Sequence, residues 1–327
     1  MLKIPYLSTK FQPHLGSKFQ GSNVCNASWA DIVWAAITVG KAERSHLLRF
    51  GKYSLFELVY RTSILFANLR EDNSYIKASS AYKALDPSEK GAISYFLGIT
   101  AAKLLAEKYL GVPWLMHLDV YRSQLSPILS AKKIKPDLVG LNLTRNWVVI
   151  EAKGRSGNLI NNVIPKAKKQ TRKLRRISGA YPSYRIALAC YFQSKTFKIA
   201  WEDPDGYDKE AKDISLSVND LLANYYDPFV HLFNEKQGQT ESFTLGRQVF
   251  STFRVDDSDL VLGIDINILN KKPSEEIIEL LTDQAHHPIG RLEDNTKIGA
   301  DGILVKLGDT WKKENMQQEP QSRQISI

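Results

Sequence analysis

Apolar residues recur at helical spacing in two segments near the beginning of the chain. The first covers residues 28–39 and ends before Gly40, and the second covers residues 54–69. Because apolar positions three or four residues apart line one face of a helix, both segments are predicted to be amphipathic helices. Ser54 and Glu57 have the spacing of a capping box at the start of the second. The apolar face of the first helix carries Trp29, Ile32, Val33, Ala36 and Ile37.

The first 25 residues lack such a period and contain prolines and glycines at irregular intervals. Prolines and glycines interrupt helices and strands, so this segment is expected to be irregular. Together with the two helices it defines a predicted helical N-terminal region over residues 1–80.

A third predicted helix has a distinct start and end. Asp86 suits the N-cap, Pro87 suits the first helical position, and Glu89 suits the third. Apolar residues continue at helical spacing to Tyr109, and Gly111 can terminate the helix. This helix opens a predicted core domain that covers residues 81–206.

Two short apolar runs in this core are separated by a polar turn. The runs cover residues 138–143 and 147–150, and residues 144–146 are polar. Apolar runs of this length around a turn predict a β-hairpin.

Charged residues lie at the end of this predicted hairpin. Asp137 precedes its first strand, and Glu151 and Lys153 follow directly along its second strand. Residues at i and i+2 of a strand point to the same face, so Glu151 and Lys153 are expected to project together. Antiparallel pairing brings Asp137 beside them.

The pattern after the hairpin predicts a helix over residues 165–178, followed by strands over residues 184–192 and 197–201. The buried side of that helix is expected to carry Ala167, Leu174 and Ile177. The order of helix, hairpin, helix and two strands favours an α/β fold with a mixed central sheet.

Signals beyond residue 206 are weaker. They predict a helix over residues 218–233, strands over 260–268 and 302–307, and a short helix over 274–281. Residues 207–312 are interpreted as a C-terminal extension or a small domain. The polar tail, residues 313–327, is expected to be disordered.

Composition places the chain among ordinary globular proteins. It has 327 residues, of which 43% are hydrophobic and 24% are charged. There is no run of about 18 apolar residues and no signal-peptide pattern, so neither a membrane span nor secretion is expected. The two cysteines, Cys25 and Cys190, form no disulfide framework, which favours a reducing cytoplasm.

Positive charge is concentrated in one short segment. The net charge is +9, and seven basic residues without an acid lie between residues 166 and 176. A solvated helix face is the plain explanation of such a run. Its closeness to the hairpin acids favours binding to a phosphate backbone instead. The predicted nucleic-acid-binding residues are Lys166, Lys168, Lys169, Arg172 and Lys173.

The hairpin acids suit a hard divalent cation. Mg²⁺ or Mn²⁺ takes one or two carboxylates and several waters, and it can activate a water toward a phosphodiester. Lys153 would supply positive charge where negative charge develops. Asp119 is an alternative acid without the hairpin context, and the adjacent pair His286 and His287 lacks the spacing of metal ligands.

The order Pro136-Asp137, gap, Glu151-Ala152-Lys153 resembles the PD-(D/E)XK, or restriction-endonuclease-like, nuclease superfamily. Gly154 after the lysine and Lys169-Gln170 on the following helix extend the resemblance. It implies an α/β/α sandwich with a mixed central sheet over residues 81–206.

The resemblance also implies roles for individual residues. Asp137, Glu151 and the carbonyl of Ala152 would bind the metal, and Lys153 would assist the attacking water. Glu89 is the preferred additional acid on the preceding helix, and Glu107 is the alternative. Gln170 is expected near the active site.

These observations predict a Mg²⁺- or Mn²⁺-dependent nuclease that hydrolyses phosphodiester bonds in DNA. The alternative is a catalytically silent nucleic-acid-binding or scaffold subunit of a larger complex. The resemblance suggests a restriction or phage-defence role, with a homodimer or a partner protein in a defence or mobile-element system, and the cysteine usage favours the cytoplasm. Neither the substrate form nor the recognition sequence follows from the residues.

Overall fold

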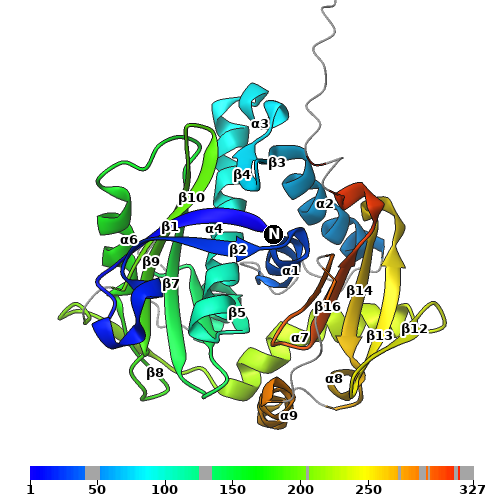
Figure 1. Cartoon of the computed structure of the whole chain (residues 1–327). Coiled ribbons are helices and arrows are strands. Elements are labelled where there is room, and N and C mark those ends of the chain that lie inside the picture. Colours follow the sequence, from blue (N-terminus) through cyan, green and yellow to red (C-terminus); the bar gives the residue numbers. More distant parts are fainter. Residues whose placement is uncertain are drawn as a thin grey trace, which may run out of the picture.

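The computed structural model describes residues 1–40, 52–124, 135–203, 206–271, 274–286, 292–293, 295–312 and 316. Within these ranges the protein is a mixed α/β structure built on a nine-stranded mixed sheet and a smaller five-stranded sheet (Figure 1). The large sheet consists of β1 (Leu2–Thr9), β2 (Gly21–Ala27), β3 (Leu69–Asp72), β4 (Tyr75–Ala78), β5 (Trp114–His117), β6 (Leu138–Leu141), β7 (Trp147–Gly154), β9 (Tyr184–Gln193) and β10 (Thr196–Glu202).

Helices pack around the two sheets. They are α1 (Trp29–Thr38), α2 (Lys52–Asn68), α3 (Ser80–Ala84), α4 (Pro87–Leu110), α6 (Val163–Thr171), α7 (Val218–Glu235), α8 (Ile266–Asn270) and α9 (Glu275–His286). Among the described helices, none combines the length and apolar character needed to cross a membrane.

The N-terminal segment contradicts the expectation of irregular structure. β1 and β2 pair antiparallel, and β1 also runs parallel to β10, with Tyr6 opposite Ile199. Leu2, Ile4 and Tyr6 alternate with more exposed positions and enter the main core. The segment therefore belongs to the same sheet as residues 81–206, and the helical description of residues 1–80 holds only for part of that region.

Capping explains why the predicted helices begin where they do. The Ser28 side chain accepts from the Asp31 backbone, and Asp86 caps α4 in the same way. Gly111 ends α4 in the left-handed conformation with φ of 60°. α2 differs from its prediction, because it begins at Lys52 and Ser54 lies inside it.

The predicted hairpin is confirmed. β6 and β7 pair antiparallel, with Leu138 opposite Ile150, and the turn contains Arg145 with φ of 61°. β5 adds to the other edge of β6, and β9 runs parallel to β7. The hairpin is thus held between two further strands.

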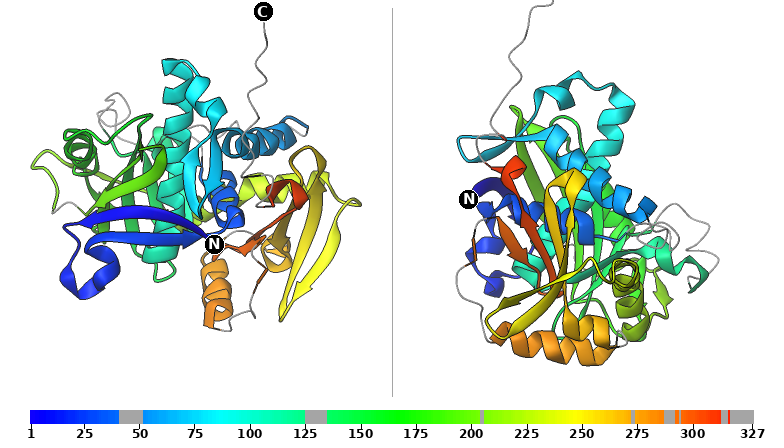
Figure 2. Two further views of the ribbon diagram at one scale, coloured as in Figure 1. Left: turned by 45° about the horizontal axis from the view of Figure 1, so that its top comes forward. Right: turned by 90° about the vertical axis from the view of Figure 1, so that its right-hand side faces the viewer.

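α4 and α6 lie on opposite faces of the sheet around β7 and β9 (Figures 1 and 2). α4 crosses β7 so closely that a Cβ on Gly154 would lie 1.7 Å from the carbonyl oxygen of Ser94. The close approach requires glycine at this position. Gly154 and Ala152 therefore face α4, and the alternation of the strand turns Glu151 and Lys153 to the α6 face.

The predicted basic helix is shorter than expected. α6 ends at Thr171, and residues 174–177 form the strand β8 (Leu174–Ile177), which pairs with β11 (Lys212–Ile214). Leu174 and Ile177 are buried, as predicted, but from a strand. Leu174 and Ile177 are three positions apart, a spacing that suits one turn of a helix and also the two ends of a four-residue strand. The spacing of apolar residues therefore could not distinguish a helix from a strand here.

The C-terminal part forms the second sheet in the order β12-β13-β14-β16-β15. Its strands are β12 (Glu241–Leu245), β13 (Gln248–Val255), β14 (Leu260–Asp265), β15 (Thr296–Ile298) and β16 (Ile303–Leu307). β12, β13 and β15 were not predicted, and the predicted strand over 260–268 ends at Asp265, which is the N-cap of α8. The predicted tail lies outside the described residues, except for the buried Met316.

A buried polar cluster joins this second sheet to the large one. Lys103 of α4 is fully buried, and its ammonium lies 3.9 Å from Oδ2 of Asp301. Its Nζ also donates to the hydroxyl of Tyr225 at 2.7 Å and lies over the ring of Trp34. The indole of Trp34 donates to Asp301 Oδ1 at 3.2 Å. α1, α4, α7 and the loop before β16 therefore meet at one ion pair.

Candidate active site

The hairpin brings Asp137 and Glu151 into direct contact. The backbone N–H of Asp137 donates to Oε2 of Glu151 at 2.9 Å. The N–H of Ala152 donates to Oδ2 of Asp137 at 3.2 Å. Both bonds lie just beyond the strand pair Leu138 and Ile150, before β6 begins, where its backbone does not yet cover β7.

Lys153 lies on the same face as Glu151, as the spacing predicts. Its ammonium forms an ion pair with Oε1 of Glu151. The carboxylate is fully buried, whereas the lysine side chain is 33% exposed. Small residues, Ala187 and Ala189, stand opposite Glu151 and Lys153 on β9 and leave room for the two long side chains.

Burial dominates the electrostatics of the two acids. It raises the pKa of Glu151 to about 8, and the negative charge of Asp137 adds to the rise while Lys153 opposes it. The pKa of Asp137 is also raised, again chiefly by burial, and Lys153 and His117 counteract this. Two neighbouring carboxylates repel each other, so a nearby positive charge favours their ionised forms.

The residues present fit a hard divalent cation. Asp137 and Glu151 supply carboxylate oxygens, and the N–H of Ala152 points to Asp137. Because the N–H and C=O of one strand residue point to the same side, the carbonyl of Ala152 faces that side too. No group of three or more His, Cys, Asp or Glu side chains suited to a metal occurs in the part of the chain that the structure describes. Mg²⁺ needs only one or two carboxylates and keeps several waters.

A second set of polar side chains surrounds Asp137 and was not predicted as part of the site. Asp119, considered only as a weaker alternative acid, accepts from Lys135 and lies 3.6 Å from Nδ1 of His117. Nε2 of His117 lies 3.2 Å from the hydroxyl of Tyr95 on α4. Pairing of β5 with β6 brings these residues to Asp137, a long-range relationship with no signal in the local sequence.

The surroundings of His117 favour its neutral form. Burial lowers its pKa, against the raising effect of Asp137 and Asp119. Its Nδ1 accepts from the N–H of Asp119 at 3.2 Å, so the neutral ring carries its proton on Nε2 and donates to Tyr95. Burial and the charges of Asp137 and Glu151 raise the pKa of Tyr95, which keeps its hydroxyl protonated.

Gln170 lies beside the segment that leads to Asp137. Its Nε2 donates to the backbone carbonyl of Lys135 at 3.2 Å. The glutamine on α6 therefore holds the chain two residues before the first acid, and it does so through the backbone.

The upstream acids lie elsewhere. Glu89 is exposed, and its carboxylate accepts from the N–H of Asp86 at 3.3 Å, which completes the capping box of α4. Glu107 contacts Lys297 of β15 at 2.9 Å and the N–H of Ala300, and so binds β15 and the loop between β15 and β16. Both are accounted for by helix capping or packing, so the preference for Glu89 as an additional acid of the site finds no support in the geometry.

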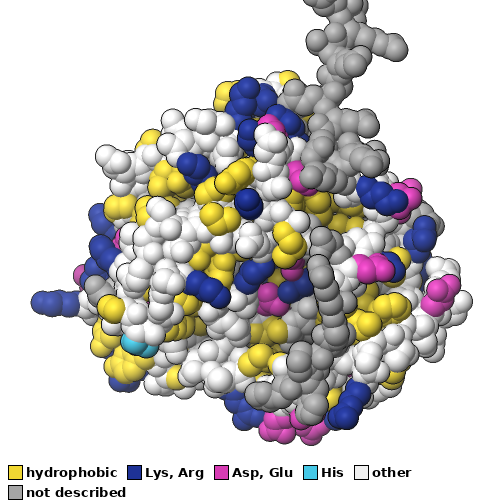
Figure 3. Space-filling model, viewed as in Figure 1, with side chains coloured by type: hydrophobic (Ala, Val, Ile, Leu, Met, Phe, Trp, Pro, Cys, Tyr) yellow, Lys and Arg dark blue, Asp and Glu magenta, His cyan; other side chains and the backbone are white. Residues whose placement is uncertain are grey.

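The basic residues are more neutralised than the sequence suggests. Lys168 pairs with Glu202, and Arg172 and Lys173 lie 3.2 and 3.1 Å from Asp208. On the face drawn in Figure 3, Lys and Arg side chains are scattered and do not form a single patch.

Two of the five predicted nucleic-acid-binding residues remain available. Lys166 and Lys169 are exposed on α6, and the described residues offer neither of them an ion pair. His286 and His287, the alternative metal pair, have side chains outside the described residues.

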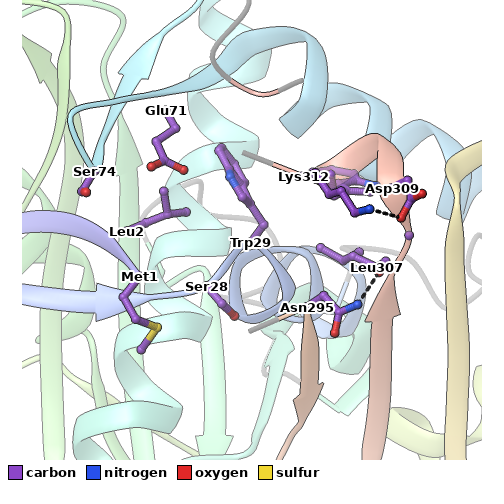
Figure 4. Close-up of a pocket in the computed structure, with 12 residues that line it drawn as sticks. Met1, Leu2, Ser28, Trp29, Glu71, Ser74, Asn295, Leu307, Asp309 and Lys312 are labelled. Atoms are coloured by element: carbon purple, nitrogen blue, oxygen red, sulfur yellow. Dashed lines mark hydrogen bonds and ion pairs between the residues drawn. The ribbon is translucent and has the colours of Figure 1, made fainter. Parts of the chain in front are cut away.

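A separate cavity of about 330 Å³ lies between β1, α1 and the end of β16 (Figure 4). Leu2, Trp29, Glu71 and Trp311 contribute to its lining, and the indole N–H of Trp29 is buried without a hydrogen-bond partner among the described residues. None of the hairpin acids lines it. The cavity belongs to the junction of the two sheets and is distinct from the acidic site.

The site thus consists of the buried carboxylate of Glu151, the partly buried Asp137 in contact with it, a half-buried lysine on the face of Glu151, and a polar set near Asp137. Comparisons of the chain with protein-family models, with curated proteins and with solved structures found no match.

Proposed function

We propose that this protein is a divalent-metal-dependent nuclease that hydrolyses phosphodiester bonds in DNA. One observation carries the proposal: Asp137 and Glu151 touch at the open end of the hairpin, with Lys153 on the face of Glu151. Paired carboxylates next to a lysine are the groups that metal-assisted phosphodiester hydrolysis needs.

The proposed roles follow from position. Asp137, Glu151 and the carbonyl of Ala152 would hold Mg²⁺ or Mn²⁺. When bound, such an ion polarises a phosphodiester and lowers the pKa of a water. Lys153, partly exposed and next to Glu151, would orient the attacking water and stabilise the negative charge that develops on the phosphate oxygens.

The surroundings support the proposal in two ways. The order of α4, the β6–β7 hairpin, α6 and β9, with helices on both faces, is compatible with the restriction-endonuclease-like α/β/α sandwich. Lys166 and Lys169 on α6 lie over the same face as Glu151 and can attract the phosphate backbone without reading sequence. A cytoplasmic restriction or defence role, alone as a dimer or with a partner protein, fits this chemistry and rests on the resemblance alone.

The decisive experiment is a cleavage assay on a panel of linear, circular and single-stranded DNA and of RNA, with Mg²⁺, with Mn²⁺ and with EDTA. The parent protein is expected to cut DNA only with metal, and Asp137→Asn, Glu151→Gln and Lys153→Met are expected to abolish cutting. Glu241→Gln, an exposed acid on β12, is the matched control and should cut at the parental rate.

Two results would overturn the proposal. Cutting by the Lys153→Met variant at the parental rate would remove the lysine from the mechanism. DNA binding by the parent protein without cleavage under any metal would instead support the catalytically silent binding subunit.

A further inference from the structure

Two tyrosines stack on the protein surface beside the N-terminal end of β9. The rings of Tyr181 and Tyr207 are 5.7 Å apart between centroids and nearly parallel, at 16°. They are 48% and 39% exposed. Tyr181 precedes β9 and Tyr207 follows β10, so only the paired strands bring them together.

Two arginines extend the stack. The guanidinium of Arg176 lies 4.4 Å from the ring centroid of Tyr181 and donates to its hydroxyl at 2.6 Å. The guanidinium of Arg185 lies 5.6 Å from the ring of Tyr207. Asp213 forms an ion pair with the neighbouring Arg175 and also lies near Arg176, whose guanidinium forms no ion pair within the described ranges. The aromatic pair therefore carries positive charge at its side.

Packing does not require this arrangement. Arg185 is buried and joins β9 to β8 by donating to the carbonyls of Leu174 and Arg175. The two tyrosine rings lie outside this contact and are absent from the hydrophobic core. Exposed aromatic faces next to cations are the features with which proteins bind unpaired bases and the phosphates between them.

The stack lies on the same side of the sheet as the acids. Arg185 and Ala187 share a face of β9 by alternation, and Ala187 stands opposite Glu151. The N–H of Ser183 donates to the carbonyl of Trp147, which is four residues, or about 13 Å, before Glu151 on β7. A strand of a few nucleotides could span this separation.

We propose that Tyr181, Tyr207 and Arg176 form a base-stacking site for single-stranded DNA. The bases would stack against the part of the two tyrosine rings that is exposed to solvent, and Arg176 would contact phosphate. The inference rests on the proposed nuclease function and deepens it, since it assigns a substrate with an unpaired segment that enters from the β8 side of the hairpin.

Binding measured without metal tests this site separately from cleavage. Fluorescence anisotropy with a labelled 15-nucleotide oligothymidine, in EDTA, compares the parent protein with Tyr181→Ala, Tyr207→Ala and the double variant. Stacking contributes about a tenfold effect per base, so each single variant is expected to weaken binding about tenfold and the double variant further. Duplex DNA of the same length should bind the parent protein more weakly, and its affinity should differ little between the parent protein and the variants.

Three variants separate stacking from other causes. Tyr181→Phe and Tyr207→Phe keep the rings and should bind nearly as the parent does. Tyr60→Ala removes an exposed tyrosine from α2 and should leave binding unchanged. Arg176→Ala should reduce the salt dependence of binding, because one phosphate contact is lost.

Several outcomes would overturn the site: no binding of the oligonucleotide by the parent protein, parental binding by the double alanine variant, or equal losses for the phenylalanine and alanine variants. An oligouridine arm shows whether RNA is bound instead, and preference for it would also contradict the assignment to DNA. If the parent protein does not bind the oligonucleotide but cleaves duplex DNA, the stacking site alone is removed. If it binds the oligonucleotide and cleaves no DNA, the nuclease proposal alone is removed.

Discussion

The backbone N–H of Asp137 donates to the carboxylate of Glu151 at 2.9 Å, although the two residues are 14 positions apart. The bond forms directly before β6 begins, so a backbone group that strand pairing leaves free is satisfied by the side chain of the second acid. This hydrogen bond holds Asp137 against Glu151 without any contribution from a substrate or a metal ion.

This contact leads to a prediction for metal binding. Asp137→Asn and Glu151→Gln should abolish the Mg²⁺ binding heat in calorimetry, because each removes an anionic oxygen donor. Lys153→Met should retain metal binding and yet reduce the cleavage rate about 100-fold or more, since the lysine acts on developing charge. Equal loss of metal binding in the lysine variant would contradict separate roles.

Substitutions of Glu89 distinguish a capping residue from a catalytic one. Glu89→Gln should keep both cleavage and stability, since glutamine can also complete a capping box. Glu89→Ala should lower the free energy of unfolding by about 0.5–1 kcal/mol without changing metal affinity. Thermal unfolding and calorimetry measure the two effects. A cleavage defect in the glutamine variant would restore Glu89 to the site.

Gly154→Ala should strongly destabilise the protein. The added Cβ would meet the carbonyl oxygen of Ser94 at 1.7 Å, and backbone on both sides has to move. We expect a loss of about 3 kcal/mol in denaturant unfolding, and a lower cleavage rate because Lys153 is adjacent. Gly157→Ala is the control, since its Cβ would meet nothing within 4 Å. Similar stabilities of the two variants would show that α4 does not pack tightly on β7.

The buried pair Lys103 and Asp301 should show strong energetic coupling. Lys103→Met leaves a buried acid without its cation, which costs about 3–5 kcal/mol. Asp301→Asn keeps an oxygen that accepts from Trp34, and the double variant should recover most of the lost stability. A double-mutant cycle in urea measures the coupling, and additive losses would contradict it.

The same lysine predicts a pH dependence. Burial lowers the pKa of Lys103 to about 8, against an ordinary value of 10.5. Between these values the unfolded chain binds the proton and the folded protein does not, so the contribution of this residue to stability rises with pH. If the pKa of Lys103 falls from its ordinary value to the folded value, its contribution to the free energy of unfolding changes by about 3 kcal/mol over this pH range.

Unfolding free energies at pH 7.5 and 9.5 test this, with Lys103→Met as the reference. The parent protein should gain stability relative to the variant as the pH rises. A parallel pH dependence in the two proteins would show that the lysine keeps its ordinary pKa.

The local sequence was sufficient to predict the structure where residues a few positions apart determine it. The N-cap of α4 at Asp86, its end at Gly111, and the common face of Glu151 and Lys153 all depend on residues a few positions apart. Sequence failed where a distant segment supplies the partner. β1 needs β10 to complete it, and the break between α6 and β8 depends on pairing with β11.

The candidate site divides in the same way. The hairpin places Asp137, Glu151 and Lys153 by alternation and antiparallel register, which the order of apolar and polar residues already determines. Only the tertiary structure decided that Tyr95, His117 and Asp119 surround the first acid, that Glu89 lies in a helix cap, and that distant carboxylates neutralise much of the basic run. The reason is that strand alternation and helix capping are local, whereas ion pairs and sheet neighbours join residues whose separation along the chain carries no periodic signal.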